Sequence, residues 1–277
     1  MGNRSRSCLA PGPVAAERGG RPGLAALLVV FLGFVGSACQ TITVEMLREN
    51  LYVVTPAGKG PFPVVIYYQG TGGHNRRAWR WAEWFKSLGV ASAIVDNARI
   101  RGRTGNPSGS MYTEDAALAW DLLTADPRID TRRVALMGFS RGGQQALEAA
   151  PLFRGTRARA DFVFALYPGG WGPDRCDSAH PGTTAVHIFF GDRDDVDRYE
   201  SSGSACRRLA YVSRSIEFHE LKGATHGYDD EYALTFYCCG GRAVRVEPNR
   251  DAVERTRAII ETAIRTRWKL SRPTSPE

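Results

Sequence analysis

Short apolar runs alternate with helix-forming segments along most of the chain. Five mostly apolar runs predict strands that are buried on both faces, at 63–68, 90–95, 134–137, 162–166 and 184–190. Helical periodicity or strong helix formers predict helices between them, at 78–88, 112–124, from 144 onward, 198–214 and 253–268. Shorter strands are predicted at 41–44, 51–55 and 216–219, the first two at the sheet edge. Strands that alternate with helices favour an α/β fold, with a mostly parallel sheet and helices on both faces.

The first 39 residues have the layout of an export signal. Arginine dominates the charges of 1–23, an apolar run follows at 24–35, and small residues lead to Cys39. The run is shorter than the roughly 20 residues of a membrane-spanning helix, which disfavours the alternative of a retained anchor. We therefore expect a signal peptide or lipoprotein signal over 1–39 and a single domain over 40–277.

This layout predicts a protein that is periplasmic, secreted or lipid-anchored. Cys39 stands where a lipoprotein signal has its lipidated cysteine. Membrane contact is expected only through the N-terminal signal or through a lipid on Cys39.

Charge gives no sign of a nucleic-acid partner. Removal of 1–39 takes away four Arg and one Glu, which lowers the formal net charge from +7 to +4. The remaining basic residues are scattered, as expected of a solvated surface, so no nucleic-acid binding is predicted. The sequence implies no metal and no organic cofactor.

Residues 138–142 read Gly-Phe-Ser-Arg-Gly and join the apolar run at 134–137 to the helix formers from 144. The bare G-x-S-x-G pattern is weak, since chance produces it in roughly one chain in five of this composition. A strand before it and a helix after it strengthen the signal. Such a sharp turn exposes the Ser140 hydroxyl at a helix N-terminus, and Gly138 and Gly142 remove side chains that would collide. We predict that Ser140 is a nucleophile.

A serine nucleophile needs a base, and the chain has five histidines. His226 lies just past the last predicted strand between flanking glycines, where an imidazole can exchange protons. His180 and His74 lie in loops and are the alternatives. His187 and His219 lie inside predicted strands and are expected to be packing or surface residues.

The base needs a carboxylate to orient it, and residues 191–197 follow the strand at 184–190 with four aspartates. A calcium loop is disfavoured because Val196 and Asp197 stand where that pattern needs a ligand and a glycine. On the chain order Ser, Asp, His, the acid is predicted to be Asp194, with Asp195 as the second choice.

From about residue 55 to the last helix, the chain resembles the dienelactone hydrolase family of α/β-hydrolases. The resemblance rests on the motifs at 69–73, 79–85, 133–143, 191–195 and 223–228. It implies an α/β-hydrolase fold and an oxyanion hole built from the backbone N–H groups of Thr71 and Arg141. In relatives the acid is the fourth residue of the Gly-x-x-Asp pattern, which falls on Asp194. The family's His-Gly at the oxyanion loop is Gln69-Gly70 here.

Founding members of that family use a cysteine nucleophile on dienelactones, whereas this chain has Ser140. The difference favours general hydrolysis of a small-molecule carboxylic ester or lactone through an acyl-serine intermediate. Two alternatives stay open: a serine peptidase of related fold, and a catalytically silent binding protein. The presence of all three of Ser140, Asp194 and His226 argues against the silent protein.

An exported chain keeps disulfides. Cys176 and Cys206 both fall at the predicted active-site end of the sheet, and we expect them to pair. The adjacent Cys238 and Cys239 are expected to form either a vicinal bridge or free thiols.

Overall fold

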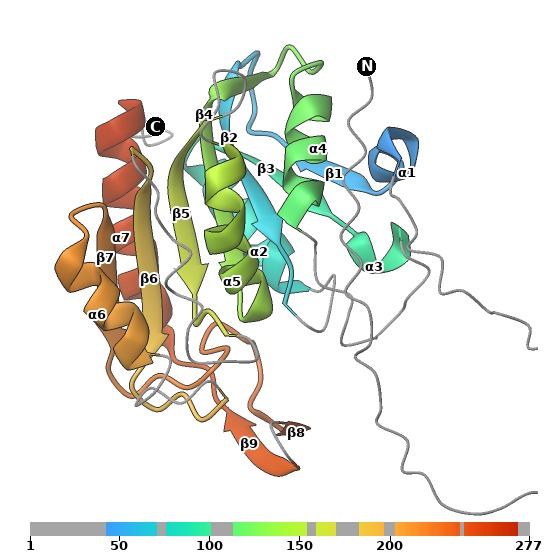
Figure 1. Cartoon of the computed structure of the whole chain (residues 1–277). Coiled ribbons are helices and arrows are strands. Elements are labelled where there is room, and N and C mark those ends of the chain that lie inside the picture. The colour runs from blue at the N-terminus through green and yellow to red at the C-terminus, as the bar shows by residue number, and fades with distance from the viewer. Residues whose placement is uncertain are drawn as a thin grey trace, which may run out of the picture. The chain divides into compact units, whose positions relative to one another are not determined.

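The centre of the fold is a seven-stranded sheet (Figure 1). The structure is a computed structural model that describes residues 43–70, 76–100, 113–153, 159–169, 183–196, 203–238 and 241–270. The strands of the sheet are β1 (Leu51–Val54), β2 (Phe62–Tyr68), β3 (Ala91–Val95), β4 (Ile129–Phe139), β5 (Ala160–Leu166), β6 (Ala185–Gly191) and β7 (Ile216–Leu221).

The strand order is β1-β3-β2-β4-β5-β6-β7. β1 pairs with β3 antiparallel, and every other pair in this sheet is parallel. The mostly parallel sheet predicted from the apolar runs is therefore confirmed. Because β4, β6 and β7 are parallel, their carboxyl ends lie at the same edge, where side chains that follow these strands meet.

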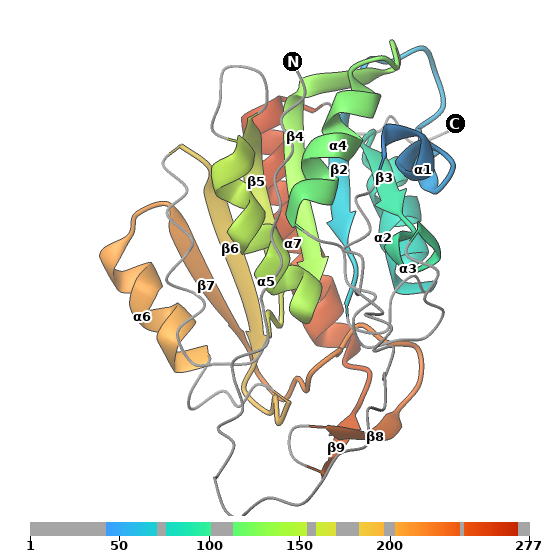
Figure 2. The ribbon, with the colours of Figure 1, turned by 45° about the vertical axis from the view of Figure 1, so that its right-hand side comes forward.

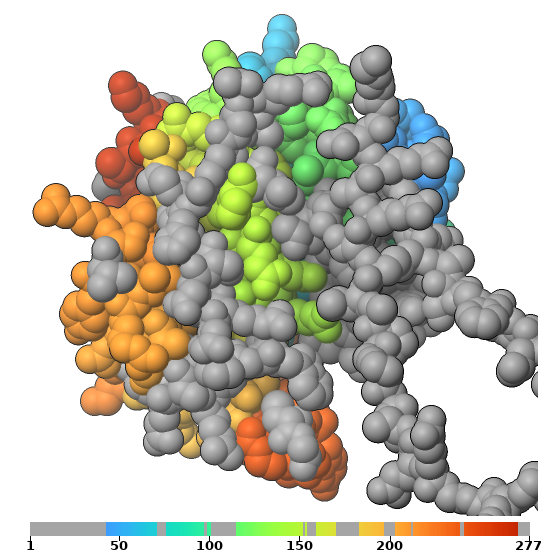
Figure 3. Space-filling model, viewed as in Figure 1, coloured from blue at the N-terminus to red at the C-terminus, as the bar shows by residue number. Residues whose placement is uncertain are grey.

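Helices cover both faces of the sheet (Figures 1 and 2). One face packs against α1 (Val44–Arg48), α3 (Asn97–Ile100), α4 (Thr113–Leu123), α5 (Arg141–Ala149) and α6 (Ser204–Val212). The other face packs against α2 (Arg76–Ser87) and α7 (Arg250–Trp268). A short 3-10 helix, Ala150–Phe153, continues α5. Figure 3 views the first face, where α5 lies between α4 and α6.

Successive side chains of β2 point to opposite faces of the sheet, so this one strand contributes to both hydrophobic cores. Val64, Ile66 and Tyr68 are buried in the core of the α5 face. Val65 and Tyr67 are buried in the core of the α2 and α7 face. A strand that is covered on both sides has no polar face, which is why its sequence is apolar throughout.

The strand predicted at 41–44 is wrong where the structure describes it. Val44 begins α1, and Thr43 is its N-cap, with a hydroxyl that accepts a hydrogen bond from the Met46 N–H at 3.2 Å. The β-branched residues suggested a strand, but a capping threonine followed by helix formers starts a helix.

A two-stranded antiparallel hairpin was not predicted. It consists of β8 (Leu234–Cys238) and β9 (Arg242–Val246). It lies beyond the carboxyl ends of the parallel strands (Figures 1 and 2). The Arg242 guanidinium donates to the backbone carbonyl of Asp195 at 3.3 Å, which ties the hairpin to the loop after β6.

The described residues belong to one compact unit, Ile42–Glu277. Within the described part of the chain, no helix combines the length and the apolar character that a membrane crossing requires. The predicted signal at 1–39 lies outside the described residues and stays a prediction.

Candidate active site

Ser140 stands alone between the end of β4 at Phe139 and the start of α5 at Arg141. Its φ of 53° and ψ of −123° lie in a region that side-chain-bearing residues rarely adopt. A Cβ on Gly138 would lie 2.0 Å from the carbonyl oxygen of Gly142, and a Cβ on Gly142 would lie 2.2 Å from that of Tyr68. Both contacts are impossible, which confirms the predicted need for glycine at these positions.

Backbone hydrogen bonds hold Ser140 in this conformation. Its N–H donates to the carbonyl of Leu166 at 3.0 Å. Its carbonyl accepts from the N–H groups of Gln144 at 3.2 Å and Gly169 at 3.1 Å. The end of β5 and the first turn of α5 therefore fix the serine, which leaves its hydroxyl at the carboxyl ends of the parallel strands.

The His226 ring bridges Ser140 and Asp194. His226 Nε2 lies 2.8 Å from Ser140 Oγ, and His226 Nδ1 lies 2.8 Å from Asp194 Oδ2. The His226 side chain is 8% exposed and that of Asp194 is 0% exposed, so the arrangement is sheltered from bulk water. Each of the three residues follows a different parallel strand: β4, β6 and β7. The structure thus brings together the predicted nucleophile, base and acid.

Asp194, and not Asp195, faces the imidazole. The second carboxylate oxygen of Asp194 accepts from the Val196 N–H at 2.9 Å, which fixes the plane of the carboxylate. Asp195 is exposed. Asp192 has a different partner, because its Oδ1 accepts from the Gly223 N–H at 2.6 Å.

The predicted oxyanion loop is only partly described. A Cβ on Gly70 would lie 3.7 Å from the Ser140 Cβ, so the end of the Gln69-Gly70 segment runs beside the serine. Arg141 is the first residue of α5, where the helix dipole favours negative charge. Thr71 lies outside the described residues, as do the alternative bases His74 and His180.

The sequence patterns did not predict the buried polar cluster beside His226. The Tyr167 ring centroid lies 4.8 Å from that of His226, edge to face. The Tyr167 hydroxyl donates to Asp229 Oδ1 at 2.6 Å, and Trp81 Nε1 donates to Asp229 Oδ2 at 2.8 Å. Arg77 Nε completes the cluster 3.2 Å from Asp229 Oδ1. Asp229 thereby holds the aromatic wall against which the imidazole rests.

Burial raises the pKa of the Tyr167 hydroxyl well above its usual value. The phenol therefore stays protonated and keeps donating to Asp229. The one local signal for this cluster was the position of Asp229, three residues after His226. Its partners Tyr167 and Trp81 come from distant segments, which local patterns cannot reveal.

His187 and His219, predicted as packing or surface residues, stack against each other in β6 and β7 with ring centroids 5.4 Å apart. Burial lowers the pKa of each histidine to about 4.

The predicted disulfide remains a prediction. Cys206 lies in α6 and is 1% exposed, whereas Cys176 lies outside the described residues. Cys238 ends β8 and is half-buried, and its neighbour Cys239 also lies outside them.

No known family profile matches the chain, and no curated protein matches its sequence. Solved structures, however, share its fold. A putative dienelactone hydrolase from Klebsiella pneumoniae is similar with a TM-score of 0.59 at 14% identity, over 76% of this chain and 90% of the other. A dienelactone hydrolase-like promiscuous phosphotriesterase from metagenomic libraries is similar with a TM-score of 0.56 at 19% identity, over 77% and 97%.

A thermophilic esterase from Thermogutta terrifontis is similar with a TM-score of 0.56 at 16% identity, over 82% of this chain and 90% of the other. At such identities the similarity establishes the fold. The chain has the α/β-hydrolase fold, and the similar structures include dienelactone hydrolase-like proteins and esterases.

Proposed function

We propose that this protein is a serine hydrolase that cleaves a small carboxylic ester or lactone through an acyl-Ser140 intermediate. The observation that carries the proposal is the His226 ring, which lies 2.8 Å from both the Ser140 hydroxyl and the Asp194 carboxylate. A hydroxyl, an imidazole and a buried carboxylate in this order are what nucleophilic acyl transfer needs.

In the first half-reaction, Ser140 Oγ attacks the ester carbonyl while His226 Nε2 takes the hydroxyl proton. The carbonyl π electrons move onto its oxygen and form a tetrahedral intermediate. Asp194 keeps the proton of the neutral imidazole on Nδ1 and stabilises the imidazolium that forms. The intermediate then collapses, the C–O bond to the alcohol breaks, and His226 gives its proton to the departing oxygen.

In the second half-reaction, water replaces the alcohol. His226 takes a proton from the water as it attacks the acyl carbon, and returns that proton to Ser140 Oγ as the carboxylic acid leaves. A lactone follows the same steps, except that its freed hydroxyl stays joined to the acyl group through the carbon chain, so hydrolysis releases a single hydroxy acid.

The oxyanion of each intermediate needs donors beside Ser140. The N–H groups of Arg141, at the start of α5, and of Thr71 are our proposed donors. The position of Gly70 beside Ser140 supports this, because it brings the chain just before Thr71 close to the serine.

Membership of the dienelactone hydrolase family is part of this proposal. The sequence motifs and the names of the similar structures support it. Ser140 in place of the founding members' cysteine favours general esters over dienelactones, and the similar esterase structures favour the same substrates.

A fluorophosphonate probe tests the proposal, because only an activated serine reacts with it. The wild-type protein should be labelled on Ser140 and should hydrolyse short nitrophenyl esters. Ser140→Ala should be neither labelled nor active on the esters. Ser213→Ala, which removes a hydroxyl outside the site, should keep both the labelling and the ester hydrolysis. Wild-type esterase activity in Ser140→Ala would refute the mechanism, and an unlabelled, inactive wild type would favour a silent binding protein.

We also propose that the protein is exported, on the basis of the arginine-rich leader, the apolar run at 24–35 and Cys39. Cell fractionation should find it outside the cytosol, with a mature N-terminus near Cys39 or Gln40. Mass spectrometry of that N-terminus distinguishes lipidated Cys39 from plain cleavage. A cytosolic product that retains Met1 would contradict the proposal.

Pairing of Cys176 with Cys206 is proposed on the same basis. Closing a loop of this size is worth roughly 3–4 kcal/mol in the chain-entropy description. Peptide mapping without reductant should recover the two cysteines in one cross-linked fragment, and a free Cys176 thiol would contradict the pairing.

A further inference from the structure

Two histidines and a glutamate meet on the sheet face that packs against α7. His187 lies in β6, and Glu217 and His219 lie in the neighbouring edge strand β7. The parallel register pairs His187 with Glu217 and Phe189 with His219. Residues two apart in a strand point to the same face, so this register brings all three side chains to one place.

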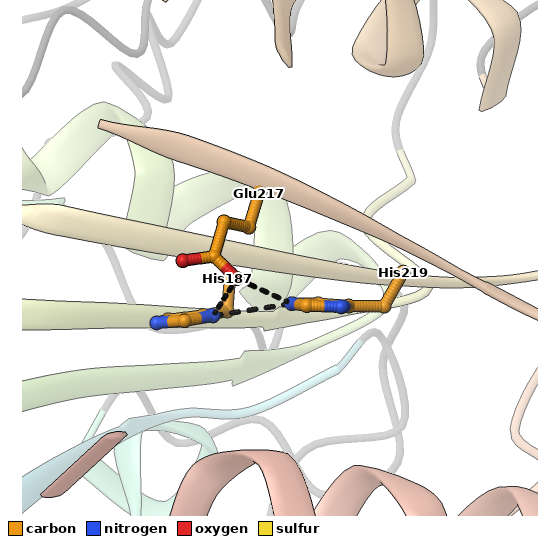
Figure 4. Close-up of side chains that lie close together, drawn as sticks. All are labelled: His187, Glu217 and His219. Atoms are coloured by element: carbon orange, nitrogen blue, oxygen red, sulfur yellow. Dashed lines mark hydrogen bonds and ion pairs between the residues drawn. The ribbon is translucent and has the colours of Figure 1, made fainter. Parts of the chain in front are cut away.

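Their ligand atoms surround a common point. His187 Nδ1 lies 3.1 Å from His219 Nε2 and 3.7 Å from Glu217 Oε2, and His219 Nε2 lies 3.8 Å from that same oxygen. Three atoms with these separations are equidistant from a point about 2.1 Å from each, which is the bond length of Zn²⁺ to imidazole nitrogen and carboxylate oxygen. Figure 4 shows the two ring nitrogens facing each other with the carboxylate reaching toward both.

The site combines a rigid side with an open one. The His187 side chain is 6% exposed, and its ring packs against Phe162 and Phe164 with centroids 6.2 and 5.6 Å away. The Glu217 side chain is 63% exposed. An ion can therefore enter from the Glu217 side and complete its coordination there with water.

The protons on the two imidazole rings can be arranged so that both rings bind an ion. Nδ1 of His187 and Nε2 of His219 share a hydrogen bond, so one carries the proton and the other a lone pair. Binding an ion requires the donor ring to move that proton to its other nitrogen, which neutral imidazole does by tautomerisation. Both rings then present lone pairs to the ion.

Charges of opposite sign lie in and near the site. Glu217 supplies a negative charge within the cluster. Arg255, in α7, is a positive charge close enough to affect His219. The arginine should weaken cation binding without occupying the ligand positions.

We propose that His187, Glu217 and His219 bind one Zn²⁺ ion, which cross-links β6 to the edge strand β7. The sequence implied no such site. The proposal does not depend on hydrolase activity, since Ser140, Asp194 and His226 are not among the ligands.

The test is Zn²⁺ binding by the purified full chain after treatment with a chelator. Competition with a chromophoric chelator should give one tight ion per chain, and Zn²⁺ should raise the Tm. Glu217→Gln and His219→Gln should each weaken this binding at least tenfold and lose the Zn²⁺-dependent rise in Tm. Arg255→Gln should tighten it.

Two controls identify the ion's position. Glu220→Gln changes a glutamate in the same strand that is not in the cluster, and should bind Zn²⁺ as the wild type does. His226→Ala should also retain the ion. The proposal is overturned if the wild type binds no Zn²⁺, if Glu217→Gln and His219→Gln bind it unchanged, or if His226→Ala loses it. Glu217 is exposed, so its variant keeps the test sound even if His219→Gln fails to fold.

Discussion

Replacing Asp194 by asparagine tests the geometry of the site most directly. Asparagine has the same shape, but one of its two polar atoms is a donor. In the wild type, Oδ1 accepts from the Val196 N–H at 2.9 Å, and Oδ2 lies 2.8 Å from His226 Nδ1. The amide must therefore choose which of these neighbours receives its oxygen.

The backbone decides the choice. The Val196 N–H can only donate, so it takes the amide oxygen, and the amide NH₂ is left facing His226 Nδ1. There it donates to Nδ1, which places the imidazole proton on Nε2. That nitrogen lies 2.8 Å from Ser140 Oγ and, once protonated, cannot accept the serine proton.

The size of the effect follows from this conflict. Flipping the amide restores the useful tautomer but leaves the Val196 N–H without an acceptor, at a cost of about 1–3 kcal/mol. Every 1.4 kcal/mol lowers the productive population about tenfold. Loss of the negative charge that stabilises the imidazolium adds to this, so kcat should fall by about 10³- to 10⁴-fold.

The assay is hydrolysis of a short nitrophenyl ester, together with the rate of fluorophosphonate labelling. Asp195→Asn is the matched control, because Asp195 is exposed and its side chain does not face His226; its kcat should stay within about threefold of wild type. If Asp194→Asn kept more than a tenth of wild-type kcat, or if Asp195→Asn were the more damaging change, the assignment of the acid would be wrong.

Three further predictions concern folding. Gly142→Ala should prevent stable folding, because its Cβ would lie 2.2 Å from the Tyr68 carbonyl oxygen; urea unfolding should show a loss of more than about 4 kcal/mol. Asp229→Asn should lower the free energy of unfolding by about 2–4 kcal/mol, since its NH₂ leaves a buried donor such as Trp81 Nε1 without an acceptor. The pKa of the Asp130 carboxyl is lowered overall. Burial by itself raises this pKa, but the hydrogen bonds from Arg132 and Arg133 together outweigh burial. Its stabilisation, about 1 kcal/mol, should therefore be present above pH about 4 and lost as the pH falls through the lowered pKa, measured as the stability difference from Asp130→Asn.

Each of these has a control. Gly89→Ala meets no atom within 4 Å but has a φ of +80°, so it should cost only about 1–2 kcal/mol. Gly142 does not have a positive φ, so an equally small loss in Gly142→Ala would show that the collision with the Tyr68 carbonyl does not occur. Asp230→Asn removes a more exposed carboxylate from the same arginine and should destabilise less than Asp229→Asn. If the Asp130→Asn difference did not change between pH 7 and pH 3, the arginine contacts would carry no stability.

The parallel sheet and the positions of Ser140, Asp194 and His226 were accessible from the sequence because each depends on local signals. Buried strands are apolar throughout, and the candidate polar residues stand directly after them. The sharp turn at Ser140 needs glycine two residues away on either side, and both glycines are visible in the sequence.

The remaining features depend on contacts between distant segments or on local signals that compete. At α1, the cap at Thr43 outweighed the strand tendency of its β-branched neighbours. The cluster at Asp229 joins residues 62 and 148 positions apart. The meeting of His187 with His219 requires the register between β6 and β7, which the pattern within either strand does not specify.

Because of the strand order, the proposed nucleophile and the proposed base lie on parts of the sheet that differ in how easily they unfold. Ser140 follows β4 at the centre of the sheet, whereas His226 follows β7 at its edge, 86 residues later in the chain. Edge elements open more readily than central ones, because fewer neighbours hold them. The reaction of Ser140 with an acylating reagent should therefore stop at a lower urea concentration than the one at which the central sheet unfolds. The reactivity of the serine thus reports whether β7 is still folded against the sheet.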